Sequence, residues 1–315
     1  MTTAIYTHPD CKLHEMGSWH PEAPDRLQAI EDQLIASRIG NWLDYREAPL
    51  ADTAAIARIH TESAIALVRD NLPPSDGEYL GYYPLDGDTS LNAHSWKAAL
   101  RAAGAAIAAT DAVMAGEIDN AFCAIRPPGH HARPSEPMGF CLFNNVAIAA
   151  AHALTAHGLQ RVAIVDFDVH HGNGTEEAFS GKPQVLMVSF FQHPFYPYSG
   201  TGGDTAKSPN MVNVPVPAHT RGDVVRALVQ QKWLPALHAH RPEMIFISAG
   251  FDAHREDDLG QMGLIEADFA WMTEQIMLVA GQYAQGRIVS CLEGGYNLSA
   301  LGRSAVAHVK ALAGL

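Results

Sequence analysis

Three polar residues alternate along the segment Asp166–His170, directly after an apolar run. If the segment keeps strand geometry, Asp166, Asp168 and His170 point to one face. Adjacent charged groups on a buried face are unfavourable unless a cation or hydrogen bonds compensate them. Carboxylate and imidazole are ligands that suit zinc. The pattern therefore indicates a metal site, although a loop of solvated polar residues at a strand end fits these five residues equally well.

Asp252 favours the metal site over the loop. It follows a second apolar run and ends the sequence Ser-Ala-Gly-Phe-Asp, where Gly250 permits a tight turn. A catalytic zinc ion typically has three protein ligands and keeps a fourth position for water. Two carboxylates also balance the charge of Zn²⁺ when the histidine is neutral. We therefore predict that Asp168, His170 and Asp252 bind a divalent metal ion.

Two other stretches carry groups that could transfer protons or stabilise charge. His130 and His131 follow Pro127–Gly129, which restricts the backbone, and an imidazole suits general acid–base catalysis. Tyr296 follows Glu293-Gly294-Gly295 and could donate a hydrogen bond to a developing oxyanion. The alternatives are structural or surface histidines and an ordinary packed tyrosine, because the chain has 17 histidines and tandem pairs arise readily.

The elements that must position these residues are visible as apolar runs. Five runs read as strands buried on both faces: Ala121–Ile125, Val162–Asp166, Val185–Phe190, Met244–Ser248 and Ile288–Leu292. Helix-compatible stretches lie between them: Ala93–Ala115, Asn145–His157, Arg221–Ala239 and Ile265–Gln285. This alternation predicts an α/β fold with a parallel sheet. Because the active site of such a sheet lies outside the carboxyl ends of its strands, the polar stretches should converge there.

Length and charge limit the class of protein. A chain of 315 residues with 47% hydrophobic residues is compatible with one domain over residues 1–315. The formal net charge of −13 opposes direct nucleic-acid binding. It suits a cationic, lysine-rich substrate, but solubility alone explains it as well.

The remaining composition points to a cytoplasmic protein. The four cysteines form no CxxC pair, so we expect reduced, buried thiols. Neither a signal peptide nor a membrane span is expected, because no apolar stretch is long enough. The segment Leu72–Asp88 is predicted to be a long surface loop. Its role is left open between a dimer contact, which would make the protein a homo-oligomer, and a lid or rim.

Five ordered motifs resemble those of the histone deacetylase superfamily. They are Arg126–His131 (RPPGHH), Gly139–Asn145 (GFCLFNN), Asp166–Gly174 (DFDVHHGNG), Ser248–Asp252 (SAGFD) and Leu292–Tyr296 (LEGGY). His20–Arg26 (HPEAPDR) resembles the entrance loop of the class II and bacterial amidohydrolase branch. With it, the matches run from residue 20 to residue 296. The resemblance implies the arginase/deacetylase α/β fold, a mostly parallel sheet of about eight strands flanked by helices on both faces.

The resemblance also implies roles for individual residues. It places zinc, or ferrous iron in the cell, on Asp168, His170 and Asp252. It makes His130 and His131 the base and acid, with His131 the main proton shuttle, and it has Asp166 orient His130 and Tyr296 polarise the acyl carbonyl. A potassium ion would be bound by main-chain oxygens of Asp166, Asp168, His170, Ser189 and Phe190.

A substrate tunnel is implied in the same way. Gly139, Phe140 and Tyr196 would line it, Asp88 would lie at its rim, and His20 and Arg26 would lie near its base or entrance. Asn173 stands where class I enzymes have an aspartate, which is typical of the class II branch and predicts a lower pKa for His131. Leu259 occupies the position of a glutamate in polyamine-selective relatives, which favours acyl-lysine. The acidic residues beside it would reverse that inference if the alignment shifted.

The expected activity is hydrolysis of an N-acyl amide on a lysine-like amine of a peptide or protein. The runner-up is an acetylpolyamine amidohydrolase. A binuclear manganese ureohydrolase would need a second set of ligands, and a non-catalytic acyl-lysine binding module would not need His130, His131 and Tyr296.

Overall fold

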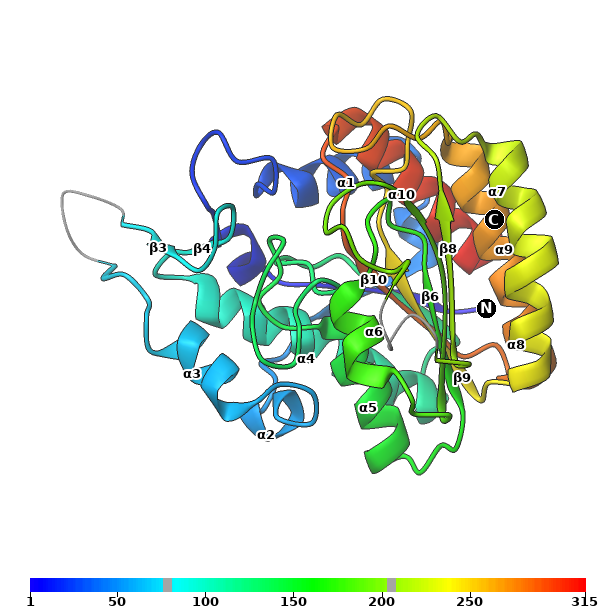
Figure 1. The fold of residues 1–315 in the computed structure, drawn as a ribbon, viewed down its shortest axis with the longest axis horizontal. Helices are drawn as coiled ribbons and strands as arrows, with labels where there is room; N and C mark the ends of the chain where they lie inside the picture. The colour runs from blue at the N-terminus through cyan, green and yellow to red at the C-terminus, as the bar shows by residue number, and fades with distance from the viewer. Residues whose placement is uncertain (76–80, 203–207) are drawn as a thin grey trace.

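The computed structural model of the protein describes residues 1–75, 81–202 and 208–315. Its centre is an eight-stranded sheet with the order β2-β1-β5-β10-β9-β6-β7-β8, and every neighbouring pair of strands is parallel (Figure 1). The strands are β1 (Thr3–Thr7), β2 (Leu43–Glu47), β5 (Asn120–Cys123), β6 (Val162–Asp166), β7 (Val185–Gln192), β8 (Met211–Val216), β9 (Met244–Ala249) and β10 (Ile288–Leu292).

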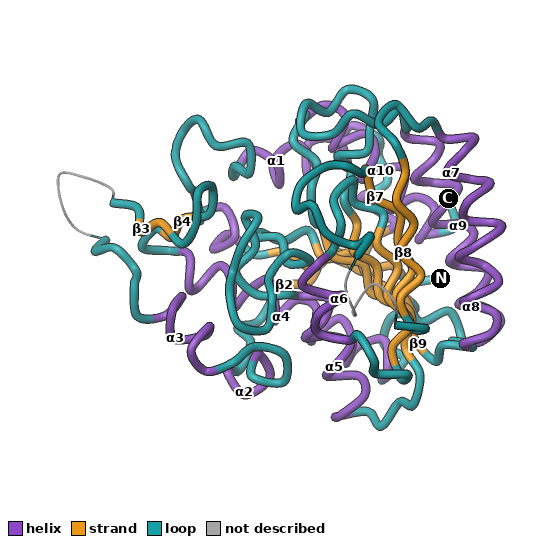
Figure 2. The backbone as a smooth tube through the Cα atoms, in the orientation of Figure 1, coloured by secondary structure: helices purple, strands orange, loops and turns teal. Residues whose placement is uncertain are grey.

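Helices cover both faces of this sheet (Figure 2). Helices α4 (Ser95–Met114) and α5 (Asn145–Ala156) pack together on one face. The other face is covered by α1 (Asp25–Ala36), α7 (Gly222–Leu228), α8 (Leu234–His240), α9 (Glu266–Tyr283) and α10 (Leu298–Ala313). The described residues also form three short α-helices, α2 (Thr53–Ile56), α3 (Glu62–Arg69) and α6 (Asn173–Phe179), and two 3-10 turns at Pro9–Lys12 and Gly40–Trp42. The predicted arginase/deacetylase arrangement, with about eight strands between two helical layers, is confirmed.

The central strands are buried because their residues are apolar on both faces. Every residue of β6, β9 and β10 is buried, as expected for inner strands of a parallel sheet. Their register aligns the strand ends, since Asp166 pairs with both Ser189 of β7 and Ser248 of β9. The loops that follow β5, β6, β7, β9 and β10 therefore leave the sheet at one edge.

Most of the predicted elements are present, with shifted ends. The strands predicted at Val162–Asp166 and Ile288–Leu292 have the expected bounds. The stretch predicted as one helix over Arg221–Ala239 begins at Gly222 and ends at His240, but a five-residue π-helical segment, Val229–Trp233, interrupts it. The sequence did not predict β1, β2, β8, α1 or α10, and all of them flank the central strands.

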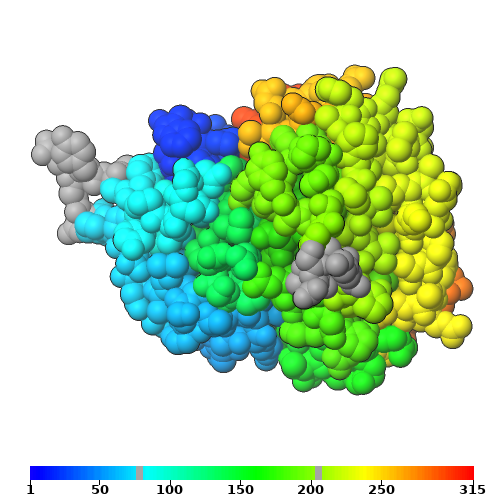
Figure 3. Space-filling view, viewed as in Figure 1, coloured from blue at the N-terminus to red at the C-terminus, as the bar shows by residue number. Residues whose placement is uncertain are grey.

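The light-blue and cyan part of the chain, to which the described ends of the segment Leu72–Asp88 belong, lies in the left part of the molecule in Figure 3. The tip of that segment, 76–80, lies outside the described residues, and the described part includes the short strand β3 (Tyr83–Pro84), which pairs with β4 (Ser90–Leu91). All four cysteines are free and buried, as predicted. Among the described residues, no helix combines the length and apolar character that a bilayer span requires.

Candidate active site

Two carboxylates and one imidazole meet at the carboxyl edge of the sheet. Asp168 and His170 lie in the loop after β6, and Asp252 lies in the loop after β9. His170 Nδ1 is 3.0 Å from Asp168 Oδ1 and 3.2 Å from Asp252 Oδ2. The ligand atoms of the three residues all lie within 4.8 Å of one another, so the structure brings the predicted metal set together.

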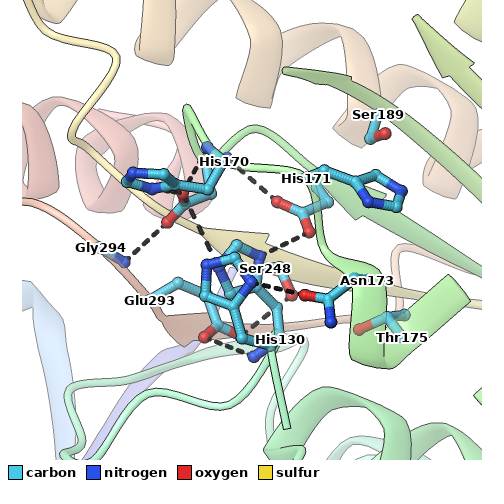
Figure 4. A network of polar contacts seen from close by, with 12 residues as sticks. His130, His170, His171, Asn173, Thr175, Ser189, Ser248, Glu293 and Gly294 are labelled. Carbon is cyan, nitrogen blue, oxygen red and sulfur yellow. Dashed lines mark hydrogen bonds and ion pairs between the residues drawn. The ribbon is translucent and has the colours of Figure 1, made fainter. Parts of the chain in front are cut away.

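Backbone amides and glycines hold the two carboxylates in place, and Figure 4 shows one of these amides, that of Gly294, in contact with a carboxylate. Gly294 N donates to Asp168 Oδ2 at 2.9 Å, and Val169 N donates to Asp252 Oδ1 at 2.9 Å. A Cβ on Gly294 would lie 2.0 Å from Asp252 Oδ2, and one on Gly250 would lie 2.1 Å from Asp168 Oδ2. The glycines of the SAGFD and EGGY motifs therefore leave space that the carboxylates occupy.

The electrostatics of this group fit a bound cation. Asp252 Oδ2 is buried and accepts no hydrogen bond from the described residues. Burial and the nearby Asp168 raise the pKa of Asp252 to about 7. Burial opposes ionisation of Asp168 too, but His130 and His170 lower its pKa. Two buried carboxylates this close are unfavourable together without positive charge between them, and a divalent ion with three O/N ligands supplies that charge.

The tandem histidines lie beside this group with different partners. His130 Nδ1 is 3.0 Å from Asp166 Oδ2, whereas His131 Nδ1 is 2.8 Å from the amide oxygen of Asn173. Burial alone would lower the pKa of His130, but Asp168 and Asp166 raise it well above its ordinary value. Burial and the neighbouring His130 lower the pKa of His131 well below its ordinary value. The pair can thus hold one protonated and one neutral imidazole.

Glu293 fixes the turn that carries the histidines, a role that was not predicted from the sequence. Its Oε2 accepts hydrogen bonds from Gly129 N at 2.6 Å and His130 N at 3.0 Å, and Ser248 Oγ donates to its Oε1 at 3.0 Å. Burial raises the pKa of Glu293 to about 7. This carboxyl group therefore connects the ends of β5, β9 and β10.

Tyr296 is positioned through its backbone and its ring. Asp257 Oδ2 accepts from Tyr296 N at 2.6 Å, and the Arg26 guanidinium lies 4.9 Å from the centre of the tyrosine ring. Burial raises the pKa of the Tyr296 phenol well above its ordinary value. The phenol is therefore protonated at neutral pH and able to donate.

A cavity of about 240 Å³ gives access to these groups. Five of the predicted tunnel and rim residues line it together with three of the chemical groups: Gly139, Phe140, Tyr196, Leu259, Asp88, His131, His170 and Tyr296. Phe195 and Asp258 line it as well and were not predicted. Phe195 stacks on the His170 ring with centroids 5.4 Å apart.

His20 and Arg26 were predicted near the base or entrance of the tunnel, and both contact residues that line the cavity without lining it themselves. His20 Nε2 is 2.9 Å from the Asp88 carbonyl oxygen, and its ring packs edge-on against Phe140. Arg26 is fully buried, where it donates to Glu22 and to the Gly295 carbonyl. Their polar groups are occupied by the protein itself, so they support the cavity without lining it.

Three of the residues predicted for potassium lie on neighbouring strands, Asp166 on β6 and Ser189 and Phe190 on β7, and the other two, Asp168 and His170, lie in the loop after β6. Asp166 of β6 pairs with Ser189 of β7, and Phe190 stacks on Trp233 with centroids 5.6 Å apart. The Ser189 carbonyl already accepts from Trp233 Nε1 at 3.2 Å. The main-chain oxygens of Asp168 and His170 accept no hydrogen bond from the described residues.

Three comparisons place the chain among known proteins. A model of the histone deacetylase domain matches residues 20–312. The histone deacetylase-like amidohydrolase of Pseudomonas aeruginosa is 36% identical, over 94% of this chain and 77% of that protein. The type-2 histone deacetylase 2 of Dictyostelium discoideum is 36% identical over 99% of this chain, which corresponds to only 21% of that longer protein.

A solved structure agrees with these relatives. The crystal structure of the HDA15 HD domain superposes with a TM-score of 0.90 at 34% sequence identity, covering 99% of this chain and 90% of that one. The eight-stranded parallel sheet, the ordered motifs and the match over residues 20–312 lead to one conclusion. The chain belongs to the histone deacetylase domain family.

Proposed function

We propose that the chain folds as one deacetylase domain over residues 1–315 and hydrolyses N-acyl amides on lysine-like amines, with acetyl-lysine of a peptide or protein as the first substrate. One observation carries this proposal. Groups from four separate loops meet at one cavity: the ligand group of Asp168, His170 and Asp252, the imidazole of His131 and the phenol of Tyr296.

The residues of the chain divide the chemistry among themselves. Asp168, His170 and Asp252 would hold a zinc ion, or ferrous iron in the cell, and such an ion polarises a carbonyl and lowers the pKa of water. His131, neutral because of its lowered pKa, accepts the proton of the attacking water. Tyr296 donates to the oxyanion of the tetrahedral intermediate. His130, whose pKa Asp168 and Asp166 raise, stabilises negative charge, and a protonated histidine of the pair returns the proton to the departing amine.

A potassium site at the main-chain oxygens of Asp166, Asp168, His170, Ser189 and Phe190 belongs to the same proposal. It is supported by the main-chain oxygens of Asp168 and His170, which accept no backbone hydrogen bond within the part of the chain that the structure describes. A potassium ion there would hold the loop that carries two of the metal ligands.

Acetylated polyamines are the second candidate substrates. Two carboxylates line the cavity, Asp88 and Asp258, and both could attract a second ammonium group. Leu259, which follows Asp258 in the sequence, also lines the cavity and favours an uncharged partner. Because Leu259 stands at the position of the glutamate expected in polyamine-selective relatives, acyl-lysine is our first choice of substrate in spite of the two carboxylates.

A substrate panel tests the proposal. The purified protein is assayed on an acetyl-lysine peptide, longer acyl-lysine peptides and acetylputrescine, with and without a chelator. We expect chelator-sensitive deacylation with a higher kcat/KM for the peptide than for acetylputrescine. A higher value for acetylputrescine would select the second candidate. Binding without turnover would instead identify an acyl-lysine binding module.

A further inference from the structure

A second group of metal-ligating side chains lies outside the cavity. It consists of Asp111, His152 and His157, and Asp111 Oδ1 is 2.6 Å from the Nε2 atom of each histidine. The two imidazole rings meet edge to face with centroids 5.4 Å apart. In the described part of the chain, this is the one group besides Asp168, His170 and Asp252 whose ligand atoms lie within 4.8 Å of one another.

The fold places this group at the edge of the sheet opposite the cavity. Asp111 lies in the last turns of α4, His152 lies in α5, and His157 directly follows α5. The chain then enters the amino end of β6, whereas the residues of the cavity follow the carboxyl ends of the strands. The second group therefore shares no residue and no loop with the candidate active site.

The exposure of the three side chains suits a site that an ion can enter from solvent. The exposed fraction is 12% for His152, 25% for His157 and 50% for Asp111. The histidines are partly enclosed and so have limited freedom, while the carboxylate remains open to water. Three protein ligands with solvent on one side leave a coordination position for water.

We propose that Asp111, His152 and His157 bind a second divalent transition-metal ion of the zinc type, which clamps the end of α4 to the end of α5. Both Nε2 atoms lie 2.6 Å from the same carboxylate oxygen, so an ion could replace these two hydrogen bonds once each ring carries its proton on Nδ1 and the ligand atoms move apart. Imidazole and carboxylate together favour zinc over magnesium or calcium, which prefer all-oxygen sites.

Arg58 sets the affinity of this site. Its Nη1 is 2.7 Å from His152 Nδ1, and a guanidinium can only donate, so Arg58 holds the proton of His152 on Nε2. Coordination through Nε2 requires the other tautomer, and the positive charge of Arg58 also opposes a cation. Arg58 is exposed and can turn into solvent, which allows binding at reduced affinity.

Metal counting on the intact protein tests the proposal. The protein is equilibrated with ZnCl2, dialysed, and its zinc content is measured by inductively coupled plasma mass spectrometry. We expect His157→Gln to bind one equivalent less than the wild type, and His238→Gln, which changes an exposed histidine of α8, to match the wild type. His157→Gln should keep the wild-type activity. Equal zinc content in the wild type and His157→Gln would overturn the proposal.

Two further variants make the result independent of the proposed activity. Asp252→Ala removes a residue of the candidate active site and should still bind the equivalent that depends on His157. If that equivalent disappears in Asp252→Ala, the second site is not independent and the proposal fails. Arg58→Ala should bind this equivalent severalfold more tightly than the wild type, and an unchanged affinity would contradict His152 Nε2 as a ligand.

Discussion

At the scale of single residues, the tandem histidines differ because of the group behind each ring. A carboxylate, Asp166, stands behind His130, and a neutral amide, Asn173, stands behind His131. The pKa of His130 is raised by Asp168 and Asp166 against the effect of burial, whereas burial and the charge on His130 lower that of His131. Two adjacent residues of one type can therefore serve as proton donor and proton acceptor.

Asn173→Asp should reverse part of this difference. A carboxylate at Nδ1 favours the protonated ring and should raise the pKa of His131 by roughly 1–3 units. The general base must be neutral to accept a proton. If the pKa of His131 is higher, the variant therefore begins to lose activity at a higher pH than the wild type as the solution is acidified. We expect the acid limb of the pH profile of kcat/KM to move upward. An unchanged or downward-shifted limb would contradict His131 as the base.

Tyr296→Phe should remove the oxyanion donor while keeping the ring contacts with Arg26 and Phe140. A single donor of this kind contributes roughly 10²–10³ in kcat. Metal content should stay at the wild-type level, because Tyr296 is not among the proposed ligands. Turnover and metal content are measured on the same preparation, and near-wild-type turnover would refute the role of the phenol.

At the scale of elements, the loop after β10 must approach the carboxylates closely. Gly294→Ala would place a Cβ 2.0 Å from Asp252 Oδ2 and 2.6 Å from Asp168 Oδ2. We expect this variant to lose bound metal and activity together. Gly281→Ala in α9 is the matched control, because its added Cβ meets no atom within 4 Å. Wild-type metal content in Gly294→Ala would show that the carboxylates do not bind metal at their present positions.

The sequence patterns of the individual elements explain why some of them could be predicted and others could not. Inner strands such as Val162–Asp166 are continuous apolar runs, and that pattern is distinctive. The edge strands β2 and β8 mix polar and apolar residues, and β8 even contains Pro215, so no such run marks them. The sequence of residues 221–239 is compatible with one continuous helix, so the π-helical segment Val229–Trp233 could not be predicted from it.

Some residues of the candidate active site could likewise be predicted from the sequence, and others could not. Asp168, His170 and Asp252 could be proposed because the ligand types and spacing of one metal are chemically restrictive. Glu22, Asp257 and Glu293 were missed as supporting residues, because their partners are distant in sequence or are backbone amides. Glu293, for example, accepts from Gly129 N and His130 N, a separation of more than 160 residues. A single sequence carries no signal of such a pairing.

At the scale of the whole molecule, one buried ion network connects the N-terminal segment to the loops of the candidate active site. Glu22 accepts from Arg26 and Arg126, and all three side chains are fully buried. Arg126 also donates to the carbonyl oxygens of Cys11 and His14, both at 2.9 Å. Arg26 reaches the Gly295 carbonyl at 2.6 Å. The network thus joins segments at the start, the middle and the end of the chain.

This network should make the free energy of unfolding depend on pH in the acid range. Burial alone would raise the pKa of Glu22, but Arg126 and Arg26 lower it to about 2 from an ordinary value of 4.5. Between these two pH values the unfolded chain binds a proton that the folded chain does not. The stabilisation by Glu22 is therefore complete above pH 4.5 and is lost as the pH falls toward 2, by about 3 kcal/mol in total.

Glu22→Gln tests this dependence, because it leaves two buried arginines without their carboxylate. At pH 7 we expect a loss of roughly 3–5 kcal/mol in the free energy of unfolding, as for other broken buried ion pairs. The difference between variant and wild type should shrink as the pH is lowered from 4.5, since the wild type then loses the same charge. Urea unfolding of both proteins in a chelator, at several pH values, measures this. Glu62→Gln, which alters an exposed pair with Arg69, should change the stability little at any pH. A constant difference across the acid range would show that the Glu22 carboxylate is not held ionised by the arginines.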